Sequence, residues 1–257
     1  MPTRLRFQIT GPTPRSPYQH ATGLRAVVLR WIAAADPQRA EEMHDSSLPK
    51  PYSLSPLQLP LASAEPLAFE VGVLDDRLVP LMLTGAEHRG PEVALGRDHF
   101  KLLSWQPVAQ TAWEELRYGQ AGPRELEVRL LTPTAHHTGA RVRKSVVLPS
   151  PELYFGGWLR RWNLYAPPEL RLDETLAEWV EEYVAVAECS GHTEAVPLDA
   201  GRLFVGFVGQ VRFTFLRARD VPEPVRAALA TLAHMAEFAG TGVETMRGMG
   251  LTKLVET

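Results

Sequence analysis

The sequence predicts an α+β protein built from two halves, each with the element order β-α-β-β-α-β. Segments in which apolar and polar residues alternate, as in half-buried strands, are interleaved with segments of helical spacing. This order recurs in the second half, and a stretch containing Gly and Pro at residues 119–123 separates the two halves. With 257 residues, of which 45% are hydrophobic and 22% charged, the chain can bury a substantial core.

The first half begins with an alternating strand at residues 5–9, and a loop rich in Gly, Pro and Ser follows at 11–17. A helix is predicted over 24–35 because apolar residues recur there at helical spacing, namely Leu24, Val27, Val28, Trp31 and Ile32. The remaining elements of this half are a short second helix that ends near Met43, strands at 52–57 and 67–73, a helix at 78–86, and a strand at 100–108.

The second half repeats this outline without an alignable sequence repeat. Its elements are a strand at 126–132, helices at 151–164 and 172–186, a strand or hairpin arm at 203–216, a helix at 222–238, and a last strand at 251–255. Each β-α-β-β-α-β unit forms an antiparallel sheet with helices on one face. We therefore expect two tandem ferredoxin-like domains, at residues 1–120 and 124–257.

Composition excludes several classes of protein. The single cysteine, Cys189, excludes an internal disulfide framework and a zinc site with paired thiolates, and it suits a reducing compartment such as the cytoplasm. The first ten residues are too polar for a signal peptide. No run of about twenty apolar residues is present, so we expect no membrane span.

The distribution of charge is more informative than the net charge of -3. The bases are 23 Arg and 4 Lys, which is compatible with RNA binding but also follows from a GC-rich genome. Residues 173–200 hold eight acids and no Lys or Arg, whereas 139–172 hold six bases and two acids. Residues 201–219 hold four bases and no acid. The segregation allows one basic face on an acidic chain.

A glycine-rich segment at residues 239–250 lies between the predicted last helix and last strand. Two interpretations stay open for it. Its glycines can allow backbone amides to approach phosphate oxygens, with charge added by Arg247; the four glycines are Gly240, Gly242, Gly248 and Gly250. Alternatively, the segment is a helix C-cap followed by a turn. It matches neither the Walker motif nor the dinucleotide fingerprint, so a nucleotide cofactor is not expected.

His44 and Lys50 share a Pro-rich loop at the end of the predicted second helix. A histidine can transfer a proton near neutral pH, and a nearby lysine can stabilise charge on a phosphate, so the pair suits metal-free RNA cleavage through the 2′-hydroxyl. A histidine at a helix C-terminus and a solvated lysine would be the structural alternative. Tyr18, His20 and Arg25 precede or begin the first helix and can complete such a site, Arg25 as a phosphate ligand. Tyr18 and His20 can equally pack the helix start.

Other motifs argue against competing chemistries. No His-Glu-x-x-His zinc motif, no carboxylate cluster with ligand spacing, and no Gly-x-Ser-x-Gly elbow occur, and we expect no metal and no cofactor. Basic residues interleave with aromatic ones in three further segments. The candidates for RNA contacts there are Arg141, Arg143, Lys144, Arg160, Arg161 and Arg212. In the helix at 151–164, the i, i+4 pair Trp158 and Trp162 is expected in the core, which would leave Arg160 and Arg161 outside.

Three of these segments together resemble the Cas6-type endoribonuclease family that processes CRISPR precursor transcripts. They are the run from His44 to Leu57 with Lys-Pro-Tyr-Ser-Leu-Ser-Pro-Leu, Leu-Thr-Pro-Thr at 131–134, and the glycine-rich run Phe-Ala-Gly-Thr-Gly-Val-Glu-Thr-Met-Arg-Gly-Met-Gly at 238–250. The resemblance spans nearly the whole chain, and the glycine-rich run is its most specific part.

The resemblance implies an enzyme that cuts CRISPR repeat RNA without a metal ion, leaving a 2′,3′-cyclic phosphate and a 5′-hydroxyl. His44 matches the family's loop histidine, as general acid or base, and Lys50 its following lysine, as charge stabiliser. Many relatives also use a tyrosine on the first helix; that helix here has none, which leaves Tyr18, His20 or Arg25. The implied partners are CRISPR precursor RNA, a second copy of the chain, and a CRISPR effector complex. The alternative functions are a subunit that binds repeat RNA without cutting it, and a nucleotide-binding regulator.

Overall fold

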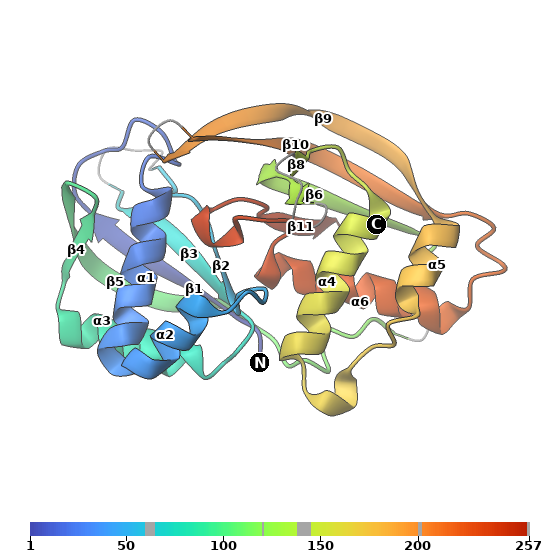
Figure 1. The fold of residues 1–257 in the computed structure, drawn as a ribbon, viewed down its shortest axis with the longest axis horizontal. Helices are drawn as coiled ribbons and strands as arrows, with labels where there is room; N and C mark the ends of the chain where they lie inside the picture. The colour runs from blue at the N-terminus through green and yellow to red at the C-terminus, as the bar shows by residue number, and fades with distance from the viewer. Residues whose placement is uncertain (60–64, 120, 138–144, 200–201, 256–257) are drawn as a thin grey trace. The chain divides into compact units, whose positions relative to one another are not determined.

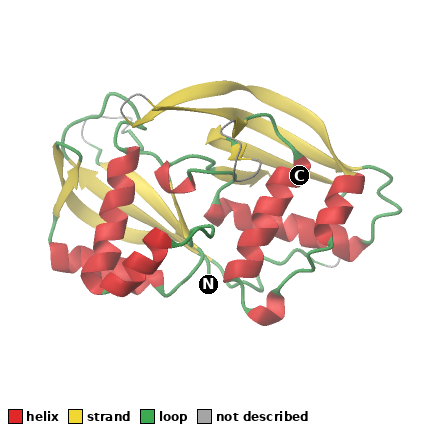
Figure 2. Cartoon of the chain, in the orientation of Figure 1, coloured by secondary structure: helices red, strands yellow, loops and turns green. Residues whose placement is uncertain are grey.

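The computed structural model describes residues 1–257 except 60–64, 120, 138–144, 200–201 and 256–257 (Figure 1). The chain divides into two compact units. The first comprises Met1–Gln110, Pro197–Leu203 and Met246–Gly248, and the second Thr111–Val196, Phe204–Thr245 and Met249–Thr257. Both combine helices with an antiparallel sheet (Figure 2), which confirms the α+β class and the ferredoxin-like topology.

The first unit contains a five-stranded sheet of order β2-β3-β1-β5-β4 with antiparallel neighbours. Its elements are β1 (Thr3–Thr10), α1 (Ala21–Ala35), α2 (Pro37–Asp45), β2 (Tyr52–Leu54), β3 (Leu67–Val73), α3 (Leu78–Arg89), β4 (Glu92–Leu95) and β5 (Asp98–Gln110). The sequence predicted all of these except β4. This strand is only four residues long and ends at a turn where Gly96 has φ +69°, so it lacks a periodic signal.

The core of the first unit lies between the sheet and helices α1 and α3, which cover one of its faces (Figure 1). Alternate residues of β1 are fully buried there, and the Phe7 ring lies 5.1 Å from that of Trp31 on α1. The two helices pack closely because Gly85 of α3 lies against the Trp31 backbone; a Cβ at Gly85 would be 1.7 Å from the Trp31 carbonyl oxygen. This packing holds α1, whose first turns carry Arg25, against α3.

The second unit contains a four-stranded sheet of order β11-β6-β10-β9 and a small two-stranded sheet, β7-β8. Its elements are β6 (Glu125–Thr134), β7 (His136–His137), β8 (Ser145–Val146), α4 (Pro151–Tyr165), the 3-10 helix η1 (Pro168–Leu170), α5 (Leu176–Tyr183), β9 (Val184–Asp199), β10 (Arg202–Phe215), α6 (Glu223–Ala239) and β11 (Thr252–Val255). A further 3-10 helix, η2 (Thr245–Arg247), precedes β11. The core of this unit is aromatic, with Tyr154, Phe155, Trp158, Trp162 and Phe213 almost fully buried.

The predicted helix at 172–186 is wrong at both ends. The helix is α5, Leu176–Tyr183, and Val184 already begins β9. The β-branched Val184 and Val186 favour the extended backbone. The strand was missed because it is an edge strand whose residues 187–193 are all exposed, so the sequence lacks the alternation that a buried face imposes. In the described part of the chain, every helix is too short or too polar to cross a membrane.

Candidate active site and glycine-rich loop

The C-terminal end of α2 presents His44 to solvent. The helix begins at Pro37 with the Asp36 side chain accepting a hydrogen bond from the Arg39 amide, and it ends one residue after His44. His44 is in the last turn and exposed. An exposed imidazole at this place can exchange protons with a bound substrate.

Lys50 folds back onto the same helix end. Its ammonium donates hydrogen bonds to the carbonyl oxygens of Met43, of Ser46 at 2.6 Å, and of His44 at 3.4 Å. These carbonyls have no partner further along the helix, so Lys50 closes the C-terminus of α2. Burial lowers the pKa of Lys50, and the charge of Arg25 lowers that pKa further. Lys50 therefore has a structural role here in addition to any role toward phosphate.

The charge of Arg25, on α1, acts on the side chains of Lys50 and Tyr52, which lie in the segment after α2. It lowers the pKa of Lys50 and opposes the burial that raises the pKa of Tyr52 far above its usual range. The Nε of Arg25 and the hydroxyl of Tyr52 are buried and lack a hydrogen-bond partner among the described residues. Two cations and a neutral phenol therefore lie near the helix end that carries His44. The cations are Arg25 and Lys50, and the phenol is that of Tyr52. Sequence analysis did not single out Tyr52; its position two residues after Lys50, at the start of a strand, was the available signal.

His20 and Tyr18 are packed at the start of α1. His20 is 6% exposed, its ring meets Phe100 edge to face at 5.3 Å, and its Nε2 lies 3.4 Å from the Asp98 carboxylate. Burial lowers the pKa of His20, although Asp98 and a hydrogen bond with the Leu95 backbone oppose this shift. Tyr18 is also buried. Both side chains are packed at the helix start.

The four glycines of the glycine-rich loop have positive φ angles, from +68° to +84°. Gly240 caps α6, and its amide donates to the Ala236 carbonyl. Several loop amides are already used: Thr241 donates to Gly250, Val243 to Ala135, and Gly250 to Pro133. The loop therefore contains the helix cap and turn that sequence analysis kept as one alternative, and these three amides are satisfied by the protein itself. Arg247, on η2, is half-buried.

The other predicted RNA contacts differ in exposure. Arg160 is exposed on α4, but the prediction that Arg161 lies outside the core is wrong, because its side chain is 8% exposed. The reason is that Arg161 follows Trp158 by one turn and so lies on the side of α4 that is buried. Arg212 is held among three carboxylates, Glu125 at 3.9 Å, Glu127 at 3.3 Å and Glu188, which balance its charge. The last three candidates, Arg141, Arg143 and Lys144, lie outside the described residues.

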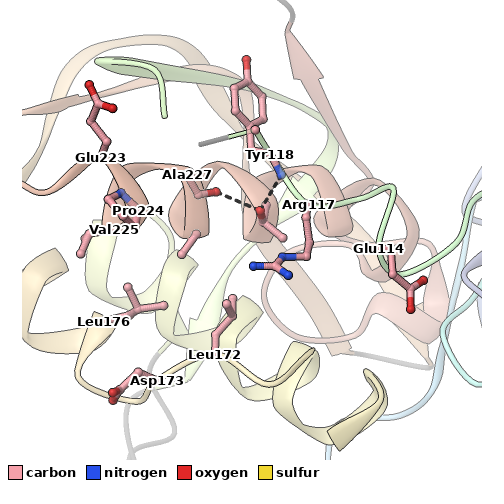
Figure 3. A pocket seen from close by; sticks show the side chains of 13 residues that line it. Glu114, Arg117, Tyr118, Leu172, Asp173, Leu176, Glu223, Pro224, Val225 and Ala227 are labelled. Atoms are coloured by element: carbon pink, nitrogen blue, oxygen red, sulfur yellow. Dashed lines mark hydrogen bonds between the residues drawn. The ribbon is translucent and has the colours of Figure 1, made fainter. Parts of the chain in front are cut away.

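A pocket of about 900 Å³ in the second unit is formed by residues 114–119, the segment leading into α5, and α6 (Figure 3). Its floor is apolar, and the Thr231 hydroxyl there accepts a hydrogen bond from the Tyr118 amide and donates one to the Ala227 carbonyl. None of the predicted site residues lines it. Among the described residues, no group of three or more His, Cys, Asp or Glu side chains is placed to hold a metal ion.

Comparison with known proteins finds a family model that matches part of the chain. Residues 128–252 match the family model of the CRISPR-associated endoribonuclease Cas6, whereas no curated protein matches the chain. A solved Cas6 product complex is 25% identical, with a TM-score of 0.83, and the match covers 99% of this chain and 100% of that chain. The same protein, Cas6 of Thermus thermophilus, matches in another structure at 23% identity and TM-score 0.72, covering 99% and 98%. A second Cas6 product complex is 21% identical, with TM-score 0.79 and 99% of both chains covered.

Proposed function

We propose that the chain is a Cas6-type CRISPR-associated endoribonuclease and that it cuts CRISPR repeat RNA by attack of a 2′-hydroxyl on the adjacent phosphate. The observation that carries the proposal is the grouping of Arg25 and Lys50 near the end of α2, where His44 is exposed. The relatives solved as product and substrate-mimic complexes support repeat RNA as the substrate class.

The proposed step needs no external reactant. The 2′-oxygen forms a bond to phosphorus while the bond from phosphorus to the 5′-oxygen breaks, which leaves a 2′,3′-cyclic phosphate and a 5′-hydroxyl. One proton leaves the 2′-oxygen and one reaches the 5′-oxygen, so proton transfer and charge stabilisation are the tasks left to the protein. His44 carries one of the two protons, and Arg25 stabilises the negative charge that grows on the phosphate oxygens. These groups can perform both tasks without a metal ion.

Lys50 contributes in this scheme by its charge and by holding the helix end. Its ammonium faces backbone carbonyls, so its proton donors are engaged in the RNA-free protein. We retain His20 and Tyr18 as supports of the α1 start, from which Arg25 projects. Binding of the repeat involves the glycine-rich loop with Arg247 and the exposed Arg160 in this proposal.

The partners and compartment are part of the proposal. The enzyme works in the cytoplasm on CRISPR precursor RNA, as a dimer of two copies, and passes its product to a CRISPR effector complex. The single cysteine supports a reducing compartment. Exposed apolar side chains on β5, namely Leu103, Trp105 and Val108, supply a surface on which a second copy can pack. Light scattering of the purified protein tests the dimer, since a monomer mass would contradict it.

A His44→Ala variant tests the catalytic role. The single-turnover rate of repeat RNA cleavage should fall by about 100-fold or more, while the Kd for RNA stays within about twofold of that of the unaltered protein. The matched control is His88→Ala, because His88 is also exposed in the last turn of a helix of the same unit. Cleavage at the normal rate by His44→Ala would remove His44 from the mechanism. Tight binding without cleavage by the unaltered protein would instead favour the RNA-binding subunit.

A further inference from the structure

Two side chains of α4 hold the start of the glycine-rich loop. The guanidinium of Arg161 donates a hydrogen bond of 2.9 Å to the carbonyl oxygen of Gly242. One turn earlier, the indole of Trp158 donates one of 3.0 Å to the hydroxyl of Thr241. The helix therefore forms hydrogen bonds with two successive residues of the loop, with the backbone of Gly242 and with the side chain of Thr241.

The charge of Arg161 has no matching carboxylate in the described part of the chain. Burial lowers the pKa of this guanidinium to about 10; Tyr165 opposes this shift, and the charge of Arg160 acts in the same direction as burial. A buried cation with one neutral acceptor is costly, and an apolar side chain of similar size would pack at lower cost. Stability of the core alone therefore does not account for an arginine at this position.

The loop also contacts Ala135, the residue that follows β6. Gly242 has φ +80°, and a Cβ there would be 2.2 Å from the Ala135 carbonyl oxygen, so the backbones touch. The amide of the next residue, Val243, donates to the same carbonyl at 3.0 Å. Loss of the Arg161 hydrogen bond would leave Gly242 without its bond to α4. The neighbouring residues would stay held, because Thr241 is also bonded to Trp158 and Gly250, and Val243 to Ala135.

We propose that Arg161 is a positioning residue for RNA binding: it fixes the backbone of the glycine-rich loop in the arrangement that receives repeat RNA, without touching the RNA. This inference rests on the proposed function, because it takes repeat RNA as the ligand of the loop. It replaces the direct RNA contact predicted from the sequence, which the burial of Arg161 excludes in this structure.

The test uses three variants of the full chain. Arg161→Met removes the hydrogen bond and the charge, and Arg161→Lys keeps the charge but loses the planar fork. Arg226→Met is the matched control, since Arg226 is equally buried at 8% but is bound by the carbonyls of Gly122, Ala218 and Val221 and lies 3.7 Å from Glu223. The measurements are the Kd for labelled repeat RNA below each variant's melting temperature, the single-turnover cleavage rate at saturating RNA, and hydrogen exchange of residues 240–245.

For Arg161→Met we expect a Kd about tenfold higher, faster exchange of residues 240–245, and a cleavage rate at saturating RNA within about threefold of normal. Arg161→Lys should give a Kd between those of the unaltered protein and Arg161→Met. If Arg161→Met does not fold, the lysine variant alone tests the positioning role of Arg161. Arg226→Met should lower the melting temperature without changing the Kd.

Three outcomes would overturn the inference. They are an unchanged Kd in folded Arg161 variants, a raised Kd with unchanged exchange of the loop, and an equal rise of the Kd in Arg226→Met. Failure of the proposed function is distinguishable, because the unaltered protein would then neither bind nor cut the repeat RNA.

Discussion

The ammonium of Lys50 lies 2.6 Å from the carbonyl oxygen of Ser46, the residue that caps the C-terminus of α2. The same group reaches the carbonyls of Met43 and His44. A lysine that satisfies terminal carbonyls also interacts favourably with the negative end of the helix dipole. The pairing ties the loop after α2 to the helix end from which His44 projects.

Replacing Lys50 should therefore affect both stability and cleavage. We expect Lys50→Met, which keeps most of the apolar stem, to lower the free energy of unfolding by about 1 to 2 kcal/mol and to slow single-turnover cleavage by about tenfold or more. Urea unfolding and cleavage assays measure the two effects. Lys101→Met, at an exposed position of β5, is the control and should change neither. Normal cleavage by Lys50→Met would show that neither its charge nor its hold on the helix end matters.

Acid should destabilise the second unit through His136. This side chain is 7% exposed and stacks on Tyr154 with the ring centroids 4.9 Å apart. Burial, with smaller contributions from Arg161 and His137, lowers its pKa from 6.5 to about 4. The unfolded chain binds the proton first as pH falls, so stability is lost between pH 6.5 and 4, by about 3 kcal/mol at the lower end.

The variant His136→Phe keeps a ring against Tyr154 and removes the titration. The free energy of unfolding, measured between pH 4 and 7, should fall less steeply on acidification in this variant than in the unaltered protein. His192→Phe, at an exposed position of β9, should keep the original slope. His20, whose pKa is also lowered, contributes in the same direction and accounts for part of the remaining slope. Identical slopes for His136→Phe and the unaltered protein would contradict a neutral buried His136.

Two glycines of the second unit should respond oppositely to alanine. Gly242→Ala places a Cβ against the Ala135 carbonyl at a positive φ, so we expect a loss of at least about 2 kcal/mol in the free energy of unfolding. Gly156 lies inside α4, where an added methyl group would meet open space, and Gly156→Ala should stabilise the chain by about 0.5 to 1 kcal/mol. Denaturant titrations measure both changes. A Gly242→Ala variant as stable as the unaltered protein would show that the loop tolerates a side chain.

The sequence predicted elements whose pattern reflects burial on one face. The strand at 67–73 was predicted with the bounds it has, and α1 was found from its apolar stripe. Strand β4 buries alternate residues but is only four residues long, and it was missed. Edge strand β9 is exposed over residues 187–193, and its start was taken for helix. In the site, the sequence predicted His44, Lys50 and Arg25 as candidates because of the chemistry of their side chains. It did not show that Lys50 turns onto carbonyls or that Arg161 is buried, because these depend on contacts with residues up to 81 positions away.

In the mechanism we propose, the chain cuts repeat RNA through an internal 2′-hydroxyl. The most direct measurement is cleavage of end-labelled repeat RNA in EDTA, beside copies in which the 2′-hydroxyl is replaced by hydrogen at one position at a time. We expect a single cut that is lost with the deoxy substitution just before the broken bond and with no other. A cut that survives every deoxy substitution, or that requires a divalent cation, would contradict it.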